Sequence, residues 1–200
     1  TTEVVYRLET ETPVVATASD NQDDYLAVLQ ENGEFSIIDV DEKTVLSNIH
    51  WKQAVKQIAF AKNGEYFVLR DDDDKVVAWE LASGRITFDM NNTPWHEAKA
   101  FIAHPVSSII AFIDDSTEHV LLFDIERSVR LPGRVLSSGN MNLLFDPTGE
   151  RILLFGNRAD GYAIQLVDIA SMKTLFTLDG LNRDEGFKNV AAFSPDGTAL

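Results

Sequence analysis

The stretch VKQIAFAKNGEYFVLRDDDDKVVAWELASGRITFD, residues 55–89, contains four short apolar runs separated by three clusters of turn-forming residues. Runs of this length, rich in β-branched and aromatic residues and bounded by Gly, Asn, Asp and Ser, are typical of β-strands. We expect strands at Val55–Ala61, Tyr66–Arg70, Lys75–Leu81 and Arg85–Asp89. No segment has the 3.6-residue apolar period of an amphipathic helix. The stretch therefore predicts a unit of four antiparallel strands.

The same unit recurs along the chain. One signature is an acid after the apolar residues of each third strand, spaced by 41, 44 and 44 residues, at Asp39, Glu80, Asp124 and Asp168. A second signature is a turn that follows a first strand, at 60–64, 145–149 and 193–197, with a weaker copy at 102–105. Repeats of this period are typical of β-propeller blades. We expect four complete units, at about 14–49, 55–90, 98–135 and 142–178.

The two signatures give the chain a resemblance to the WD40 repeat family. Phe193-Ser194-Pro195-Asp196-Gly197 matches the family's turn, and Trp79-Glu80-Leu81 nearly matches its Trp-Asp signature. The family's opening Gly-His pair is reduced to Ile49-His50, so its buried hydrogen-bond network is not expected to be complete. The turns at 82–85 and 170–173 also resemble those of quinoprotein-like propellers. The resemblance implies an all-β propeller of four-stranded antiparallel blades that acts as a protein-interaction platform.

The two ends of the chain carry partial units. Glu3–Leu8 reads as one strand, and residues 187–200 read as the opening strand and turn of a further blade. A propeller blade is usually completed by strands from both ends of the domain, and an open set of blades would leave unpaired edges. We therefore expect residues 1–200 to form a single β-propeller domain, or part of one, that continues beyond residue 200.

Composition excludes several classes of protein. The 17 Lys and Arg against 32 Asp and Glu give a net charge of −15, so nucleic acid is not an expected partner. Apolar runs such as Ile109–Ile113 are too short to span a bilayer. The absence of cysteine excludes disulfides and thiolate chemistry. Together with a first residue other than Met, it slightly favours an exported bacterial envelope protein over a cytoplasmic one.

The candidate binding surface is one rim of the propeller, where hairpins between second and third strands meet the links between blades. We expect it to bind a protein or peptide with a basic surface, since aromatic side chains supply contact area and acids steer the partner. Its candidate residues are His50, Trp51, Asp71, Asp72, Asp73, Asp74, Trp95, His96, Asp114, Asp115, Arg158, Asp160 and Arg183.

Trp51 and Trp95 have two possible roles. They occupy nearly the same place in successive units, which suits a pair of exposed anchors for a partner. Tryptophan is mostly buried on average, however, so packing between blades is slightly favoured.

Metal, cofactor and catalytic motifs are not expected. The four histidines lack ligand spacing, and the run Asp71–Asp74 lacks the glycine and alternation of a calcium loop. Asp71–Lys75 also matches the sequence that enteropeptidase cleaves. No nucleophile elbow, phosphate loop or zinc-protease motif is present.

We therefore expect a non-catalytic interaction scaffold. The alternative is a cell-envelope propeller with a small-ligand or hydrolytic site at the central channel.

Overall fold

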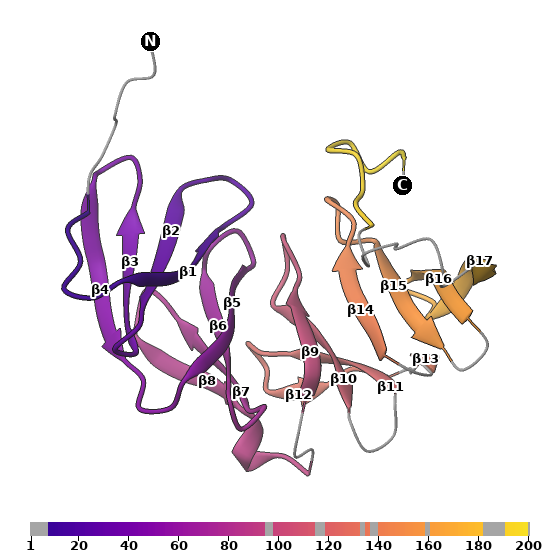
Figure 1. The fold of residues 1–200 in the computed structure, drawn as a ribbon, viewed down its shortest axis with the longest axis horizontal. Coiled ribbons are helices and arrows are strands. Elements are labelled where there is room, and N and C mark those ends of the chain that lie inside the picture. The colour runs from indigo at the N-terminus through magenta and orange to yellow at the C-terminus, as the bar shows by residue number, and fades with distance from the viewer. Residues whose placement is uncertain are drawn as a thin grey trace.

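The computed structural model of the chain describes residues 8–94, 98–114, 119–132, 135–136, 140–158, 161–181 and 191–199. Their strands form four antiparallel sheets that follow one another along the sequence (Figure 1). The only helix among these residues is the short 3-10 helix η1, Met90–Asn92. The prediction of an all-β propeller built from four-stranded blades is confirmed. We number the sheets as blades 1 to 4 in chain order.

Each blade is a simple up-and-down meander. Blade 1 contains β1 (Val14–Ser19), β2 (Tyr25–Gln30), β3 (Glu34–Asp39) and β4 (Thr44–His50). Blade 2 contains β5 (Val55–Ala61), β6 (Tyr66–Asp71), β7 (Val76–Glu80) and β8 (Arg85–Asp89). Blade 3 contains β9 (Ala98–Ala103), β10 (Ile109–Asp114), β11 (His119–Asp124) and two short strands that both pair with β11, β12 (Val129–Arg130) and β13 (Val135–Leu136). Blade 4 contains β14 (Asn140–Phe145), β15 (Arg151–Arg158), β16 (Gly161–Asp168) and β17 (Lys173–Leu181).

The blades follow one another around an arc, with their first strands on its inner side (Figure 1). Among these inner strands, β1 contacts β5, β5 contacts β9, and β9 contacts β14. Because successive strands of a blade are antiparallel, the hairpin between the second and third strands lies at one end of the blade. The turns after the first and third strands lie at the other end. We call the first end of each blade the link end and the second the turn end.

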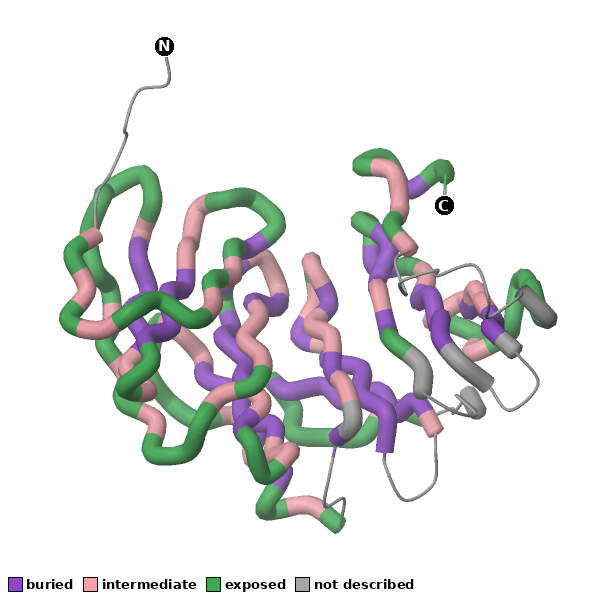
Figure 2. The backbone as a smooth tube through the Cα atoms, in the orientation of Figure 1, coloured by how far each residue is buried: buried purple, intermediate pink, exposed green. Residues whose placement is uncertain are grey.

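The core lies between blades rather than within them. Figure 2 shows the buried residues concentrated along the second and third strands, with exposed residues on the outer strands and loops. Between blades 1 and 2, Phe35, Phe67 and Trp79 form a buried aromatic cluster. Between blades 2 and 3, the rings of Phe88 and Phe123 lie 4.5 Å apart. Blades 2 and 3 are apolar on both faces because each face packs against a neighbouring blade.

The acids that end the third strands close the turns that follow them. Asp39 Oδ1 accepts a hydrogen bond from Glu42 N at 2.8 Å, and Asp168 Oδ1 accepts one from Ser171 N at 2.8 Å. Asp124 Oδ1 accepts hydrogen bonds from Glu126 N and Arg127 N, both at 3.1 Å. This pattern explains the aspartates of the repeated signature, because a carboxylate satisfies backbone N–H groups that a tight turn leaves unpaired. In blade 2, Glu80 instead accepts a hydrogen bond from Ser83 Oγ at 2.6 Å.

The turns after the first strands join neighbouring blades. Lys62 N and Asn63 N of blade 2 donate to the carbonyl oxygens of His104 and Pro105 of blade 3, at 3.1 and 2.8 Å. On its other side the same turn packs against blade 1, since a Cβ added at Gly64 would lie 2.3 Å from the Tyr25 ring. This one turn therefore contacts three blades.

The outer strands contain a bulge at one repeated place. In blade 1 the register shifts between Ile37 and Ile38, which leaves Leu46 of β4 without a partner residue. In blade 2 the shift between Ala78 and Trp79 leaves Thr87 of β8 unpaired in the same way. A bulge redirects a side chain relative to the regular pleat.

The expected partial units are only partly described. Of the strand expected at Glu3–Leu8, only Leu8 lies within the described residues. Residues 191–199 form a turn in which Ser194 N donates to Ala199 O at 2.9 Å, and no strand is assigned to them. This turn joins blade 4, because Arg151 Nη2 donates to Gly197 O at 2.7 Å. No helix in the described part of the chain is long and apolar enough to cross a membrane.

Candidate functional site

The acidic run Asp71–Asp74 forms the hairpin between β6 and β7 at the link end of blade 2. Asp71 is only 3% exposed. Its Oδ1 accepts hydrogen bonds from Asp73 N at 3.1 Å and from Lys75 N at 3.0 Å. The Asp71 carboxylate therefore holds the hairpin together rather than facing a partner. Asp114, at the corresponding end of β10, is also buried, at 5% exposed.

Asp74 fixes the hairpin to its surroundings. Its Oδ1 lies 2.7 Å from Arg70 Nη1 and 2.9 Å from Lys56 Nζ. Its carbonyl oxygen accepts a hydrogen bond from Ala98 N at 3.0 Å, at the start of blade 3. The hairpin is thus anchored to two blades, and Asp72 and Asp73 remain as its exposed acids. Two carboxylates on an anchored hairpin lose little conformational freedom when a cation binds them.

Trp51 lies in the link from blade 1 to blade 2 and is partly buried. Its ring packs edge-on against Trp79, with ring centroids 5.4 Å apart and an interplanar angle of 89°. Its backbone N donates to Gly33 O at 3.0 Å, and a Cβ added at Gly33 would lie 2.5 Å from Trp51 O. The structure therefore places this indole between blades 1 and 2. Its Nε1 is buried and has no hydrogen-bond partner within the described part of the chain.

The other candidate residues fall into three groups. His50 is exposed at the end of β4, opposite Glu34. Arg158 ends β15, where its backbone pairs with Gly161. The remaining candidates lie outside the described residues; they are Trp95, His96, Asp115, Asp160 and Arg183. Within the described part of the rim, the structure brings Trp51 to the β2–β3 hairpin and the acidic hairpin to the start of β9.

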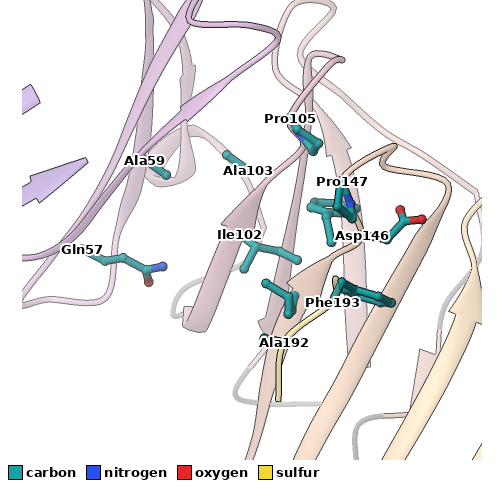
Figure 3. A pocket seen from close by; sticks show the side chains of 11 residues that line it. Gln57, Ala59, Ile102, Ala103, Pro105, Asp146, Pro147, Ala192 and Phe193 are labelled. Carbon is teal, nitrogen blue, oxygen red and sulfur yellow. The ribbon is translucent and has the colours of Figure 1, made fainter. Parts of the chain in front are cut away.

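A groove of about 440 Å³ lies along the inner strands. Figure 3 shows that its lining comes from β5, β9, β14 and the segment that contains Ala192 and Phe193. Gln57 and Asp146 are its polar side chains. Gln57 Nε2 donates to Phe101 O at 2.7 Å, and Asp146 pairs with Arg151 at 2.9 Å. Hydrogen bonds from Arg151 and Thr148 outweigh the burial of Asp146 and lower its pKa. The carboxylate most suited to catalysis in this groove is therefore already bound as an anion.

His104 caps the turn that follows β9. It is 6% exposed, and its Nδ1 accepts hydrogen bonds from Val106 N at 3.1 Å and Ser107 N at 3.0 Å. Its Nε2 must therefore carry the proton and donates to Gly149 O of blade 4 at 2.9 Å. Burial lowers the pKa of His104, which keeps the imidazole neutral. The position of His104 in a repeated turn could have predicted its capping role. Its hydrogen bond to Gly149 O of blade 4 could not be predicted from the sequence.

No group of three or more acids and histidines in the described residues is arranged to hold a metal ion. The acids that are abundant in the sequence serve the turns instead. Asp20, for example, accepts hydrogen bonds from Tyr25 N at 2.8 Å and Gln22 N at 3.3 Å.

Comparison with known proteins supports the fold. No family model matches the sequence, and no curated protein matches it. Among solved structures, the chain is similar to the Cps50 (Swd1) β-propeller domain of Myceliophteria thermophila, with a TM-score of 0.64 and 13% sequence identity. The similarity covers 86% of this chain and 58% of that domain, so the chain spans less than two thirds of the length of the propeller it matches.

Proposed function

We propose that the chain is a non-catalytic scaffold that binds a protein or peptide with a basic surface through its link-end rim. The anchored hairpin at Asp71–Asp74 is the observation that carries this proposal. It presents Asp72 and Asp73 to solvent on a backbone held by two blades. The net charge of −15 would attract a basic partner before contact.

The use of the polar side chains supports binding rather than catalysis. A general acid or base needs a titratable group that is free to exchange a proton with a substrate. Asp71, Asp124, Asp146 and His104 each hold backbone N–H groups in fixed hydrogen bonds. These groups would have to give up structural bonds before they could act on a substrate.

The repeats are proposed to be divergent WD40 repeats that belong to one propeller continuing beyond residue 200. The turn at residues 191–199 supports this proposal. Phe193 packs with the apolar face of blade 4, and Arg151 bonds to Gly197 O just as His104 bonds to Gly149 O. Residues 191–199 therefore contact blade 4 in the same way as the first turn of blade 4 contacts blade 3.

Selection of short peptides from a random display library tests the binding role. We expect the selected peptides to be enriched in Lys and Arg and to bind more weakly as salt is raised, because exposed charge pairs are screened. Reversing both exposed acids, Asp72→Lys with Asp73→Lys, should weaken binding of these peptides about tenfold or more.

The matched control reverses two exposed acids on a turn-end loop of blade 1, Asp41→Lys with Glu42→Lys. It makes the same change in net charge at the other end of a blade. Equal loss of binding in both variants, or selected peptides with no excess of basic residues, would reject the rim as the binding surface.

A further inference from the structure

A second groove lies at the turn end of blades 1 and 2, away from the rim. Its volume is about 420 Å³, and its apolar lining comes from Tyr25, Leu46 and Leu81. We call it the blade 1–2 groove. A groove of this size suits one or two side chains of a bound peptide rather than a large ligand.

The blade 1–2 groove is preformed. Leu46 is the unpaired bulge residue of β4, and it is 51% exposed beside the groove although it is a large aliphatic side chain. The Tyr25 ring lies so close to Gly64 that a Cβ there would meet it at 2.3 Å. Gly64 has φ +82°, which fixes the turn in a conformation that suits glycine. The walls are therefore held by the fold before any ligand binds.

The equivalent position between blades 2 and 3 is narrower, with a cavity of only about 180 Å³ lined by Thr87, Phe123 and Ser128 among others. There the bulge residue is Thr87, and its carbonyl oxygen accepts a hydrogen bond from Ser128 Oγ of blade 3. Ser128 lies four residues after the third-strand acid Asp124, and the residue at that place in blade 2 is Gly84. A Cβ added at Gly84 would have no heavy atom within 4 Å. The Ser128 side chain thus bridges blades 2 and 3, whereas no side chain bridges blades 1 and 2 at the corresponding position, Gly84.

Hydrogen-bond acceptors border the open groove. The Glu65 side chain is 57% exposed, and Glu80 contributes a second carboxylate. Asn63 Oδ1 is buried and has no hydrogen-bond partner within the described residues. The Lys62 side chain pairs with Glu65 at 3.0 Å and with Glu126 at 3.1 Å, so its charge is offset. The groove therefore combines an apolar floor with a border that favours N–H donors and positive charge.

The geometry points to a second binding site, in which the blade 1–2 groove takes a short segment of a partner protein that presents an aliphatic side chain beside an arginine or lysine. The aliphatic side chain packs on Leu46 and Tyr25, and the cation pairs with Glu65 and Glu80. This site is separate from the link-end rim, so either can fail without the other.

Amide chemical shifts test the site directly. The probe is a blocked six-residue peptide of alternating leucine and arginine, added to the isotope-labelled chain. We expect the largest shifts at Gly64, Glu65 and Ala82, and weaker binding of a peptide in which citrulline replaces arginine. Absence of shifts at these amides, or shifts confined to Asp72 and Asp73, overturns the proposal.

Two variants test the apolar floor and the acidic border of the groove separately. Leu46→Ser should weaken peptide binding at least about fivefold, since it removes apolar contact area. Glu65→Gln with Glu80→Gln should weaken it about three- to tenfold. All three side chains are exposed or partly exposed, so the fold is expected to survive.

The controls are matched to these changes. Val129→Ser alters an aliphatic residue of similar exposure, 45%, on the outer strand of blade 3. Asp41→Asn with Glu42→Gln removes two charges on another turn. Neither should change the affinity for the peptide, and a loss equal to that of the groove variants would mean that the peptide binds by general charge or apolarity alone.

Discussion

Replacing Trp79 by alanine tests whether the joint between blades 1 and 2 depends on one aromatic cluster. Trp79 is 5% exposed near the end of β7. Its ring centroid lies 5.4 Å from Trp51, 6.1 Å from Phe35 and 6.2 Å from Phe67. Truncation removes a large buried side chain and leaves a cavity between two blades, so Trp79→Ala should lower the free energy of unfolding by about 3–5 kcal/mol.

The same experiment measures how much of the role of Trp51 is structural. An edge-on aromatic pair contributes about 0.5–1.5 kcal/mol beyond the area that it buries. The double variant Trp51→Ala with Trp79→Ala should therefore lose less stability than the two single losses added together, by about that amount. A structural role predicts this coupling even if Trp51 also contacts a partner.

Urea unfolding followed by far-ultraviolet circular dichroism gives the four free energies without relying on tryptophan fluorescence. Val106→Ala, at a side chain that is 45% exposed, serves as the control and should change stability by less than about 0.5 kcal/mol. A loss below about 1 kcal/mol for Trp79→Ala, or additive losses in the double variant, would refute this account of the joint.

The turns give four further expected outcomes. The pKa of His104 is below its ordinary value of 6.5, so the unfolded chain binds more protons and stability should fall as pH drops below about 6.5; urea midpoints should show a flatter pH dependence for His104→Gln. Gly149→Ala should lower the free energy of unfolding by more than about 2 kcal/mol, because its Cβ would lie 2.0 Å from the His104 ring. Gly84→Ala, with φ +66° but open space, should cost only about 1 kcal/mol in the same urea titration, and equal losses would contradict the clash. Enteropeptidase should cut the folded chain after Lys75 much more slowly than a peptide of the same sequence, as gel electrophoresis of timed digests can show; equal rates would mean that the Asp71–Lys75 hairpin is not held.

The strands could be predicted because their signals are local. In blade 2 the expected strands and the observed β5 to β8 differ by at most one residue at any boundary. Alternating apolar runs and turn residues determine such boundaries through neighbouring residues alone. The capping role of the third-strand acids follows from the same short range, since Asp39 bonds to a residue only three positions away.

The contacts between blades could not be read from the sequence. Asp71 looked like an exposed rim acid, yet its carboxylate is buried in its own hairpin. Trp51 had two possible roles until its ring was found against Trp79, in the next blade. The bulge at Leu46 depends on how β3 and β4 pair, and a bulge leaves no distinct pattern in a single strand. These features are set by long-range packing, which one sequence does not reveal.

The joints between blades have a consequence for how the repeats can change over time. Several hydrogen bonds between neighbouring blades have a backbone carbonyl oxygen as the acceptor. The carbonyl oxygens of His104, Pro105, Gly149 and Gly197 accept hydrogen bonds from the preceding blade. A carbonyl is present at every position, whatever the side chain. Mutation can therefore alter an accepting residue without losing the acceptor wherever the new side chain fits, which it does not at Gly149 beside the His104 ring. The repeats can then become hard to recognise from residue identity while the arc of blades keeps its geometry.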